Sequence, residues 1–220
     1  MPLPEGPDHD LLSVAGLVRM QRHEFALDTV ELARSLVGAY ISYRGRLLRI
    51  TETEAYRGGD DPASHAHRGR TRRNAPMFGP PGHLYVYFTY GMHNCVNVVG
   101  AAEGEPSGVL LRAGELLVLD PLSRAMESDP ANGEPRTSAV GPGRLGRAVG
   151  ASVADSGMDV CAPEAEVAFF HGKPGAPDSA VASSRRIGVS DGAEIEWRFF
   201  DMTSRLVSKH PRGLLNHTFG

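Results

Sequence analysis

The stretch AYISYRGRLLRITETEAY, residues 39–56, predicts a β-hairpin around which the rest of the chain can be arranged. Its first strand ends at Tyr43, and Arg44-Gly45 forms the turn. The second strand runs from Arg46 to about Tyr56. The polar half of that strand, TETEAY, follows directly on its apolar half, LLRI.

Two carboxylates stand out on the second strand. Side chains alternate between the faces of a strand, so Glu52, Glu54 and Tyr56 share one face, with the carboxylates ~7 Å apart. Inverting glycosidases use a similar separation to place a water between an acid and a base. A solvated strand face is the alternative interpretation, and the pattern alone leaves both open.

Further patterns predict an α+β domain with an antiparallel sheet. Asp28 and Glu31 have the spacing of a capping box and predict a helix through about Val37. Tyr90-Gly91 predicts the turn of a second hairpin, in HLYVYFTYGMHNCVNVV. The remaining expected elements are a long surface loop over 57–82, one or two strands in 107–119, short helices in 123–127 and 141–150, and strands in 158–170, 184–190 and 196–202.

The composition favours one intracellular domain. The chain has 220 residues, no apolar run of about 18 residues and only two cysteines, so we expect a cytoplasmic protein without a disulfide framework, a signal peptide or a membrane span. Its net charge is −3, but residues 44–73 carry eight arginines against four acids. The chain has 21 arginines and only two lysines, which a codon-composition bias explains first, although arginine also suits bidentate phosphate contacts.

The histidines allow a zinc site as an alternative. His65, His67 and His93 include an H-x-H pair, but they match neither the H-E-x-x-H pattern nor that of the zinc base deaminases. Polar or hydrogen-bonded histidines explain them better, and we expect no metal. Tyr90 has a different environment, because an aromatic ring at a hairpin tip lacks a core to enter and suits insertion into stacked nucleic acid.

Residues 52–99, together with Leu110 to Arg112, closely resemble the 3-methyladenine DNA glycosylases of the alkyladenine DNA glycosylase family. The resemblance rests on E-T-E-A-Y, a His nine residues after that Tyr, R-N-x-x-M-F-x-x-P-G, L-Y-V-Y-x-x-Y-G-M, C-x-N-V and L-L-R, in that order. It extends more weakly through GPGRLGRAVG and RRIGVS to WRFF. The match implies a glycosylase domain over residues 25–208, an N-terminal tail over 1–24 and a C-terminal tail over 209–220.

The family resemblance also implies a fold and an activity. The fold is α+β, a single domain with a curved, mainly antiparallel sheet, surrounding helices and a protruding β-hairpin, similar to the C-terminal domain of formyltransferases. The activity belongs to base excision repair. The enzyme flips an alkylated purine out of duplex DNA and hydrolyses its N-glycosidic bond, which leaves an abasic site.

The resemblance assigns roles to individual residues. Glu54 matches the general base that activates the attacking water, Arg112 helps to hold that water and carboxylate, and the Ile187 carbonyl supplies a further contact. Glu52 is then a supporting charge, paired with an arginine. The other implied roles are a base-binding pocket of Tyr56, His65, Tyr87, Asn97 and Ile187, and intercalation into DNA by Tyr90 and Met92.

The chemistry of the side chains narrows the reaction further. A glycosylase that also cuts the backbone needs an amine nucleophile, and both lysines, Lys173 and Lys209, lie far from the motifs in the sequence. The opening MPLPEG is similar to that of formamidopyrimidine-type glycosylases, where Pro2 is the nucleophile, but Leu3 replaces their Glu. We therefore expect a monomeric, monofunctional hydrolase of damaged double-stranded DNA that needs no cofactor. A non-catalytic damage-binding protein and a zinc hydrolase are the alternatives.

Overall fold

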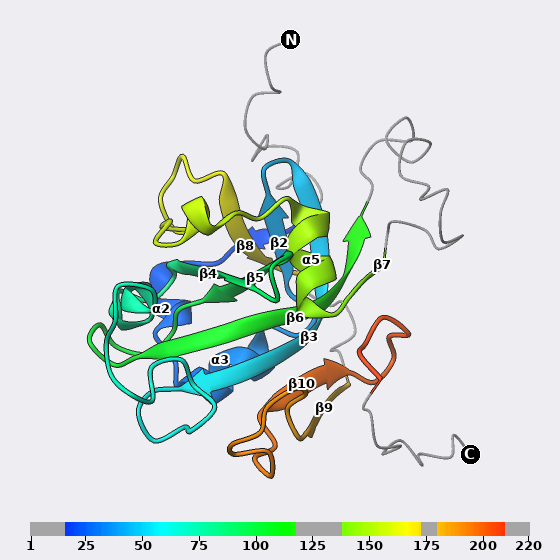
Figure 1. Ribbon diagram of the computed structural model, residues 1–220. Coiled ribbons are helices and arrows are strands. Elements are labelled where there is room, and N and C mark those ends of the chain that lie inside the picture. The colour runs from blue at the N-terminus through cyan, green and yellow to red at the C-terminus, as the bar shows by residue number, and fades with distance from the viewer. Residues whose placement is uncertain (1–15, 118–137, 173–179, 210–220) are drawn as a thin grey trace.

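The computed structural model describes residues 16–117, 138–172 and 180–209. These residues form one open sheet in the order β1-β8-β2-β3-β6-β5-β4, with β10 on β3, β9 on β10 and β7 on β6 (Figure 1). Every strand pair is antiparallel, which confirms the α+β class. The strands are β1 (Val18–Arg19), β2 (Tyr40–Tyr43), β3 (Arg46–Arg57), β4 (Leu84–Thr89), β5 (His93–Val98), β6 (Ser107–Leu117), β7 (Ser138–Val140), β8 (Val167–His171), β9 (Val181–Ser184) and β10 (Arg198–Asp201).

Short helices cover the sheet. They are α2 (Arg22–Phe25), α3 (Thr29–Ser35), α5 (Pro142–Val149) and the 3-10 turns η1 (Ala75–Phe78) and η2 (Val153–Asp155). The helix expected after Asp28 is confirmed as α3, and the Asp28 carboxylate accepts hydrogen bonds from the Val30 and Glu31 amides at its first turn. Leu32 of α3 is fully buried in the main core, which also holds residues from the strands of the sheet. The apolar side of the helix thus explains why it packs on the sheet.

The first hairpin has the predicted turn. β2 ends at Tyr43, β3 begins at Arg46, and both turn residues have positive φ, 47° at Arg44 and 79° at Gly45. Such a pair of φ values belongs to the turns whose twist matches that of the flanking strands. The long strand β3 then crosses the molecule beside β6, as Figure 1 shows.

A double irregularity between β3 and β6 turns the polar end of β3 away from the core. The register passes from Ile50 opposite Gly114 to Glu52 opposite Ala113, and then to Thr53 opposite Leu111, so it skips Thr51 and Arg112. Before this point Leu48 and Ile50 belong to the main core, and after it Ala55 does. The bulge therefore changes which alternate residues of β3 face the core. As a result, Glu52, Glu54 and Tyr56 share the opposite face.

The structure corrects parts of the sequence-based assignment. Residues 185–190 are not a strand, since β9 ends at Ser184, and they form irregular backbone that reaches the end of β3. In the range 158–170 only the last residues are in a strand, β8. Residues 107–117 form one strand, and the helix expected at 123–127 lies outside the described residues. The sheet also begins with Val18, which pairs with His171, inside the expected N-terminal tail.

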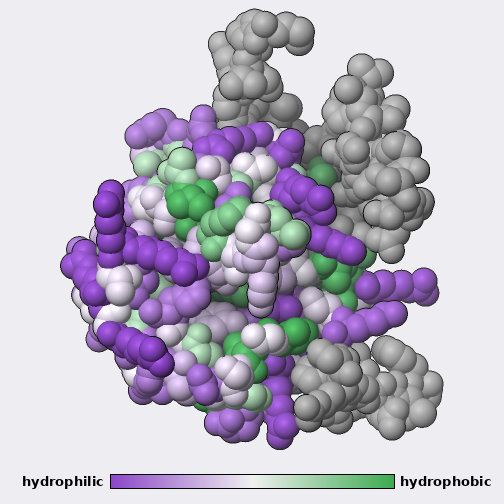
Figure 2. Space-filling view, viewed as in Figure 1, coloured by the Kyte–Doolittle hydropathy of each residue, from purple (hydrophilic) through white to green (hydrophobic). Residues whose placement is uncertain are grey.

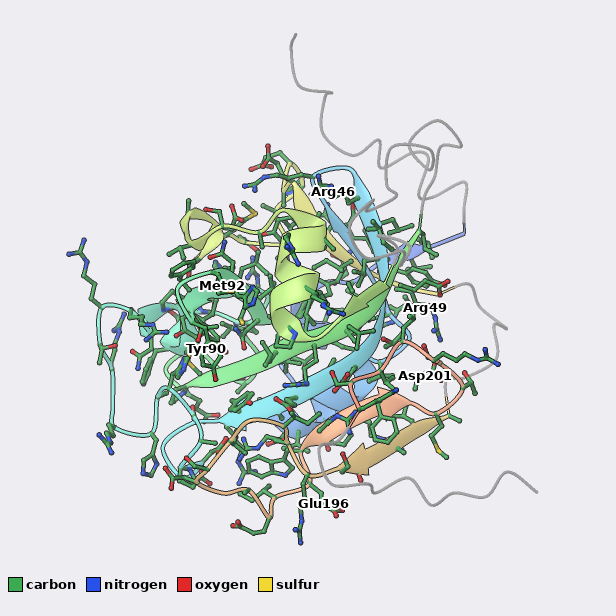
Figure 3. The ribbon with its side chains drawn as sticks, turned by 45° about the vertical axis from the view of Figure 1, so that its right-hand side comes forward. Arg46, Arg49, Tyr90, Met92, Glu196 and Asp201 are labelled. Carbon is green, nitrogen blue, oxygen red and sulfur yellow. The ribbon has the colours of Figure 1, made fainter. Side chains whose placement is uncertain are left out.

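The surface in view is mainly hydrophilic at its margin, with small apolar patches nearer its middle (Figure 2). The second hairpin, β4–β5, carries two of the most exposed apolar side chains, Tyr90 at 83% and Met92 at 70% exposure. Both labels lie at this hairpin in Figure 3. On another part of the molecule the same figure shows Arg49 and Asp201, which form an ion pair of 2.8 Å. Among the described residues, no helix has the length and apolar character needed to span a membrane.

Candidate active site

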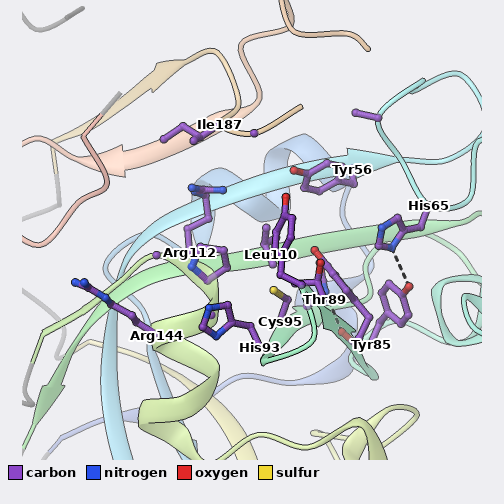
Figure 4. Close-up of a pocket in the computed structure, with 18 of the residues that line it drawn as sticks. Tyr56, His65, Tyr85, Thr89, His93, Cys95, Leu110, Arg112, Arg144 and Ile187 are labelled. Atoms are coloured by element: carbon purple, nitrogen blue, oxygen red, sulfur yellow. Dashed lines mark hydrogen bonds between the residues drawn. The ribbon is translucent and has the colours of Figure 1, made fainter. Parts of the chain in front are cut away.

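A cavity of about 600 Å³ lies where β3, β4, β5 and β6 meet the start of α5 and the segment after β9 (Figure 4). Most of the residues predicted for base binding and catalysis line it, although they come from distant parts of the sequence. They are Tyr56, His65, Tyr87, Asn97, Arg112 and Ile187.

Glu54 lies beneath the cavity wall rather than in it, and its side chain is fully buried. One carboxylate oxygen, Oε2, accepts hydrogen bonds from the Tyr56 hydroxyl at 2.8 Å and from Arg112 Nη1 at 3.0 Å. The other oxygen, Oε1, accepts the Ile187 backbone N–H at 2.7 Å. All three donors belong to residues that line the cavity, so Glu54 is separated from it by a single layer of side chains and backbone. The expected role of the Ile187 carbonyl stays a prediction.

Arg112 connects the two glutamates. Its Nε donates to Glu52 Oε1 at 2.9 Å while its Nη1 donates to Glu54. Burial alone would lower the pKa of Arg112, but the charges of Glu54 and Glu52 outweigh it and raise the pKa above its usual value. Figure 4 shows the guanidinium pointing towards Ile187. Arg112 is therefore a permanent cation placed between a buried carboxylate and the cavity.

Glu52 is paired with an arginine, as expected, and with a second one as well. Its Oε1 also accepts Arg198 Nε at 2.6 Å, and its Oε2 accepts the Ser208 backbone N–H at 2.6 Å. The side chain is fully buried and does not line the cavity. Burial by itself would raise the pKa of Glu52, but Arg112 and Arg198 hold it below its usual range. Glu52 is consequently a buried anion without access to a bound molecule.

Aromatic rings form the deep end of the cavity. The His65 and Tyr87 ring centroids are 4.6 Å apart with an interplanar angle of 75°, an edge-to-face contact. His65 Nδ1 lies 2.9 Å from the Tyr85 hydroxyl, and both hydroxyl and imidazole are drawn in Figure 4. Burial, and then the nearby cation of Arg73, lower the pKa of His65. The imidazole is thus neutral at physiological pH, which suits a ring that stacks on a ligand.

Tyr56 forms the opposite wall and has support behind it. The guanidinium carbon of Arg186 lies 4.8 Å from the centroid of the Tyr56 ring. Arg186 is held there by Asp61, which accepts its Nη1 at 2.6 Å and its Nη2 at 2.8 Å, with both side chains fully buried. Burial and the adjacent Glu54 charge raise the pKa of Tyr56 well above its usual value, so its hydroxyl remains a donor.

Asn97 lines the cavity with its amide already oriented. Its Nδ2 donates to the Tyr85 carbonyl at 2.9 Å, and the residue is only 4% exposed. Asn97 also pairs with Leu110 of β6, another lining residue. The amide is therefore a fixed polar group that a bound base would meet.

The tip of the β4–β5 hairpin lies at the border of this cavity. Tyr90 lines it, whereas Met92 is outside the lining. Tyr90 and Gly91 have positive φ, and the Met92 amide donates to the Thr89 carbonyl at 3.2 Å, which closes the turn. This backbone holds the exposed Tyr90 ring at the tip, beside the aromatic walls.

The start of α5 closes the side of the cavity next to the hairpin. A Cβ on Gly143 would lie 2.5 Å from Cγ of His93, so only glycine allows this approach. His93, Gly143 and Arg144 all line the cavity. From the sequence, His93 was considered only as an alternative zinc ligand.

The zinc alternative has no ligand set in the part of the chain that the structure describes. There, no three His, Cys, Asp or Glu side chains could hold one metal ion. His65 is hydrogen-bonded to Tyr85, and His67 Nδ1 lies 2.7 Å from the Gly59 carbonyl oxygen.

Sequence reasoning missed the residues that act from behind the cavity wall. Arg186, Asp61 and Arg198 had no role in the expected site. Their local sequences, GGDD, RRIG and EWRF, contain no signal that separates a buried ion pair from a surface charge. Only the fold brings these charges to the cavity.

Comparisons with known proteins agree on one family. A sequence model of the family "Methylpurine-DNA glycosylase (MPG)" matches residues 23–205. A protein of Streptomyces avermitilis is 45% identical over 197 residues, covering 87% of this chain and 91% of its own. Similar proteins of Nocardia farcinica and Burkholderia lata are 42% and 44% identical, covering 86% and 74% of this chain and 90% and 78% of their own. All three carry 3-methyladenine DNA glycosylase as a provisional name.

Proposed function

The chain belongs to the methylpurine-DNA glycosylase family, and from this premise we propose that it excises alkylated purines, 3-methyladenine among them, from duplex DNA. One observation carries the proposal: a buried glutamate lies directly behind an aromatic cavity whose border carries an exposed tyrosine. A carboxylate, a base-sized aromatic pocket and a wedge are the parts that base excision from a duplex requires.

Extrusion of the base would use the hairpin. Tyr90 enters the stack and fills the gap that the flipped nucleotide leaves, with Met92 beside it. The base then stacks among Tyr56, His65 and Tyr87. Electron-rich ring faces attract a cation, so a positively charged alkylated purine binds better than a neutral one. The oriented amide of Asn97 would discriminate against the exocyclic amino group of guanine.

Hydrolysis would follow at the wall that covers Glu54. The water oxygen bonds to C1′ of the sugar, the bond from C1′ to the purine nitrogen breaks, and its electron pair neutralises the positive charge of the leaving base. Glu54 takes the proton of the water. Its charge also stabilises the oxocarbenium character of the sugar as the base departs. The products are the free base and an abasic site.

The water must reach a carboxylate that is fully covered in the free protein. Tyr56 and Arg112 share one oxygen of Glu54, and both residues line the cavity. We infer that stacking of the base on Tyr56 loosens its hydroxyl from that oxygen. Arg112 keeps its own contact and steers the water to the freed position.

The product should be an intact DNA strand with an abasic site. Formation of a Schiff base requires an amine at the site, and neither Lys173 nor Lys209 belongs to the motifs that form it. We expect borohydride to trap no covalent adduct on damaged duplex. We further expect a monomer that acts on chromosomal DNA in the cytoplasm.

Glu54→Gln tests the mechanism. Since a general base contributes about 10²–10⁴-fold, release of 3-methyladenine from methylated duplex under single-turnover conditions should fall by at least about 10²-fold. Duplex binding should persist, because Glu54 is fully buried behind the cavity lining. The matched control is Glu105→Gln, an exposed glutamate on the loop before β6, which should keep the rate of the parent.

Two results would contradict the proposal. An unchanged release rate in Glu54→Gln would remove Glu54 from its role. A parent protein that binds methylated duplex tightly and releases no base would indicate a damage-binding protein instead.

A further inference from the structure

Glu52 is a buried acid next to the site for which the proposed mechanism has no use. Its carboxylate lies outside the cavity lining and is fully buried. It nevertheless accepts three short hydrogen bonds, from Arg112, Arg198 and the Ser208 amide. Burying a carboxylate costs free energy unless the group is paired and hydrogen-bonded. A buried carboxylate with three donors therefore suggests that Glu52 has a role near the site.

The backbone is distorted at the same place. The pairing of β3 with β6 shifts register on both sides of Glu52 and skips Arg112. Bulges re-aim side chains and are frequent next to active sites. Here the bulge brings the Nε edge of Arg112 against Glu52, while its Nη1 reaches Glu54 two residues further along β3.

The hydrogen bonds of Arg112 show what Glu52 does for it. A guanidinium has five N–H donors in a rigid, planar fork. Glu52 occupies the Nε donor and Glu54 one Nη1 donor, and Arg112 makes no other hydrogen bond among the described residues. Fixing Nε fixes the plane of the whole fork. The remaining donors are therefore held at the cavity that Arg112 lines.

The charges near Glu54 also balance only if Glu52 is ionised. Glu52 and Glu54 offset Arg112 and Arg198, which gives a buried quartet with no net charge. Arg186 behind Tyr56 is neutralised separately by Asp61. The charged and titratable groups that face Glu54 are Arg112 on β6, Glu52 and Tyr56 on β3, Tyr87 on β4, Arg186 after β9 and, across the strand pair, Arg198 on β10.

We propose that Glu52 is a positioning residue of the glycosylase reaction: it anchors the Nε edge of Arg112, so that this arginine stays on Glu54, and it cancels the charge of Arg198. The proposal rests on the proposed function, because it assigns Glu52 a part in the same reaction. Arg198 is the outer half of this anchor. Its Nη1 and Nη2 donate to the Ser184 hydroxyl and the Ser208 carbonyl, which tie it to β9 and to the end of the described chain.

Two variants and a control distinguish a positioning role of Glu52 from a contribution to stability alone. Glu52→Gln leaves the quartet with a net charge of +1, and the double variant Glu52→Gln/Arg198→Gln restores it to zero. The control is Asp155→Asn, which removes another buried carboxylate that is paired with an arginine, Arg44, outside the cavity. Each protein is assayed for single-turnover release of 3-methyladenine over a range of pH.

Glu52→Gln should lower the plateau rate by at least about tenfold, since Arg112 is no longer fixed. It should also move the acid limb of the profile to lower pH, because the variant leaves the quartet with an uncompensated positive charge. In the double variant the limb should return towards that of the parent while the plateau stays low. Asp155→Asn should change neither the plateau rate nor the position of the acid limb, although this variant is less stable than the parent.

A second readout does not depend on activity. The Glu54 carboxyl carbon, assigned with Glu54→Gln, is titrated by ¹³C NMR in the parent, Glu52→Gln and the double variant. The midpoint should fall in the single variant and recover in the double variant. If Glu52→Gln does not fold, the double variant and the parent are compared, and a plateau rate within threefold of the parent in the double variant overturns the proposal.

The outcomes are distinguishable. If Glu52→Gln keeps its plateau rate and both midpoints stay in place, Glu52 is only structural and the proposal fails while the proposed function stands. If the parent releases no base but the NMR midpoint moves as described, the proposed function fails and the coupling of Glu52 to Glu54 stands. An unmoved NMR midpoint overturns the coupling in either case.

Discussion

Asp60 and Asp61 are adjacent in the sequence, yet the structure predicts opposite outcomes for the same substitution. Asp61→Asn removes the charge from a bidentate pair with Arg186 in which both side chains are fully buried. Breaking a buried pair on one side costs about 3–5 kcal/mol, because the remaining charge stays buried without compensation. Among the described residues, the carbonyls of Ala55 and Gly192 are then the acceptors left to Arg186 besides the new amide.

Asp60→Asn is the matched control. Its side chain is 68% exposed and pairs with Arg57, itself 43% exposed, and surface pairs of this kind contribute little. Equilibrium unfolding in urea should therefore give a loss in Asp61→Asn at least about 2 kcal/mol larger than in Asp60→Asn. Equal losses in the two variants would refute the reasoning from burial.

Asp61→Asn should also impair excision. Arg186 packs behind Tyr56 and directly precedes Ile187, whose amide donates to Glu54. A loosened Arg186 would therefore disturb two contacts of Glu54 together. Under conditions where the variant is folded, the single-turnover rate should fall while Asp60→Asn keeps the rate of the parent.

Two further predictions concern the hairpin and the effect of pH. Tyr90→Ala should lower the single-turnover rate of excision from duplex DNA by about tenfold, because it removes one stacking contact. The rate on single-stranded substrate and the free energy of unfolding should change little. Met202→Ala, which truncates another exposed side chain, should change neither of the two rates. Asp155→Asn should cost about 1.5–3 kcal/mol at pH 7, as it weakens charged hydrogen bonds from Tyr43 and Arg44. Burial alone would raise the pKa of Asp155, but these bonds lower it below its usual value. The difference in unfolding free energy between parent and variant should therefore have its full size above the usual carboxyl range and shrink as the pH falls below about 4. Urea unfolding at each pH measures this difference.

Local signals were sufficient for the hairpins and for α3. The turns at Arg44-Gly45 and Tyr90-Gly91, and the cap at Asp28, are determined by a few neighbouring residues, and each was found where it was predicted. The bulge in β3 could not be predicted in this way, because it depends on the register with β6, some sixty residues further along the chain. In the segment SRRIGVS only Ser184 is in a strand; beyond it, the Arg186 side chain donates to Asp61 and the Ile187 amide donates to Glu54.

The site was predictable only as far as its motifs extend. The family resemblance named several of the residues that line the cavity, and the structure brings these together. It also shows contacts that the motifs do not indicate: His65 Nδ1 lies 2.9 Å from the Tyr85 hydroxyl, and Arg186 packs behind Tyr56. These partners act over long sequence separations, and a single charged or aromatic residue in a short motif gives no sign of them.

The spacing of Glu52 and Glu54 suggested an acid and a base of equal standing, and their surroundings make them unequal. Every donor to Glu54 comes from a residue that lines the cavity, so a bound nucleotide can rearrange those bonds and expose a carboxylate oxygen. Two of the three donors to Glu52, from Arg198 and Ser208, belong to residues outside the lining, and no ligand in the cavity can release them. A cationic purine is already a good leaving group and needs no second carboxyl group as its acid. The proposed reaction therefore needs one accessible glutamate, and Arg112 is the link through which the inaccessible one would still affect it.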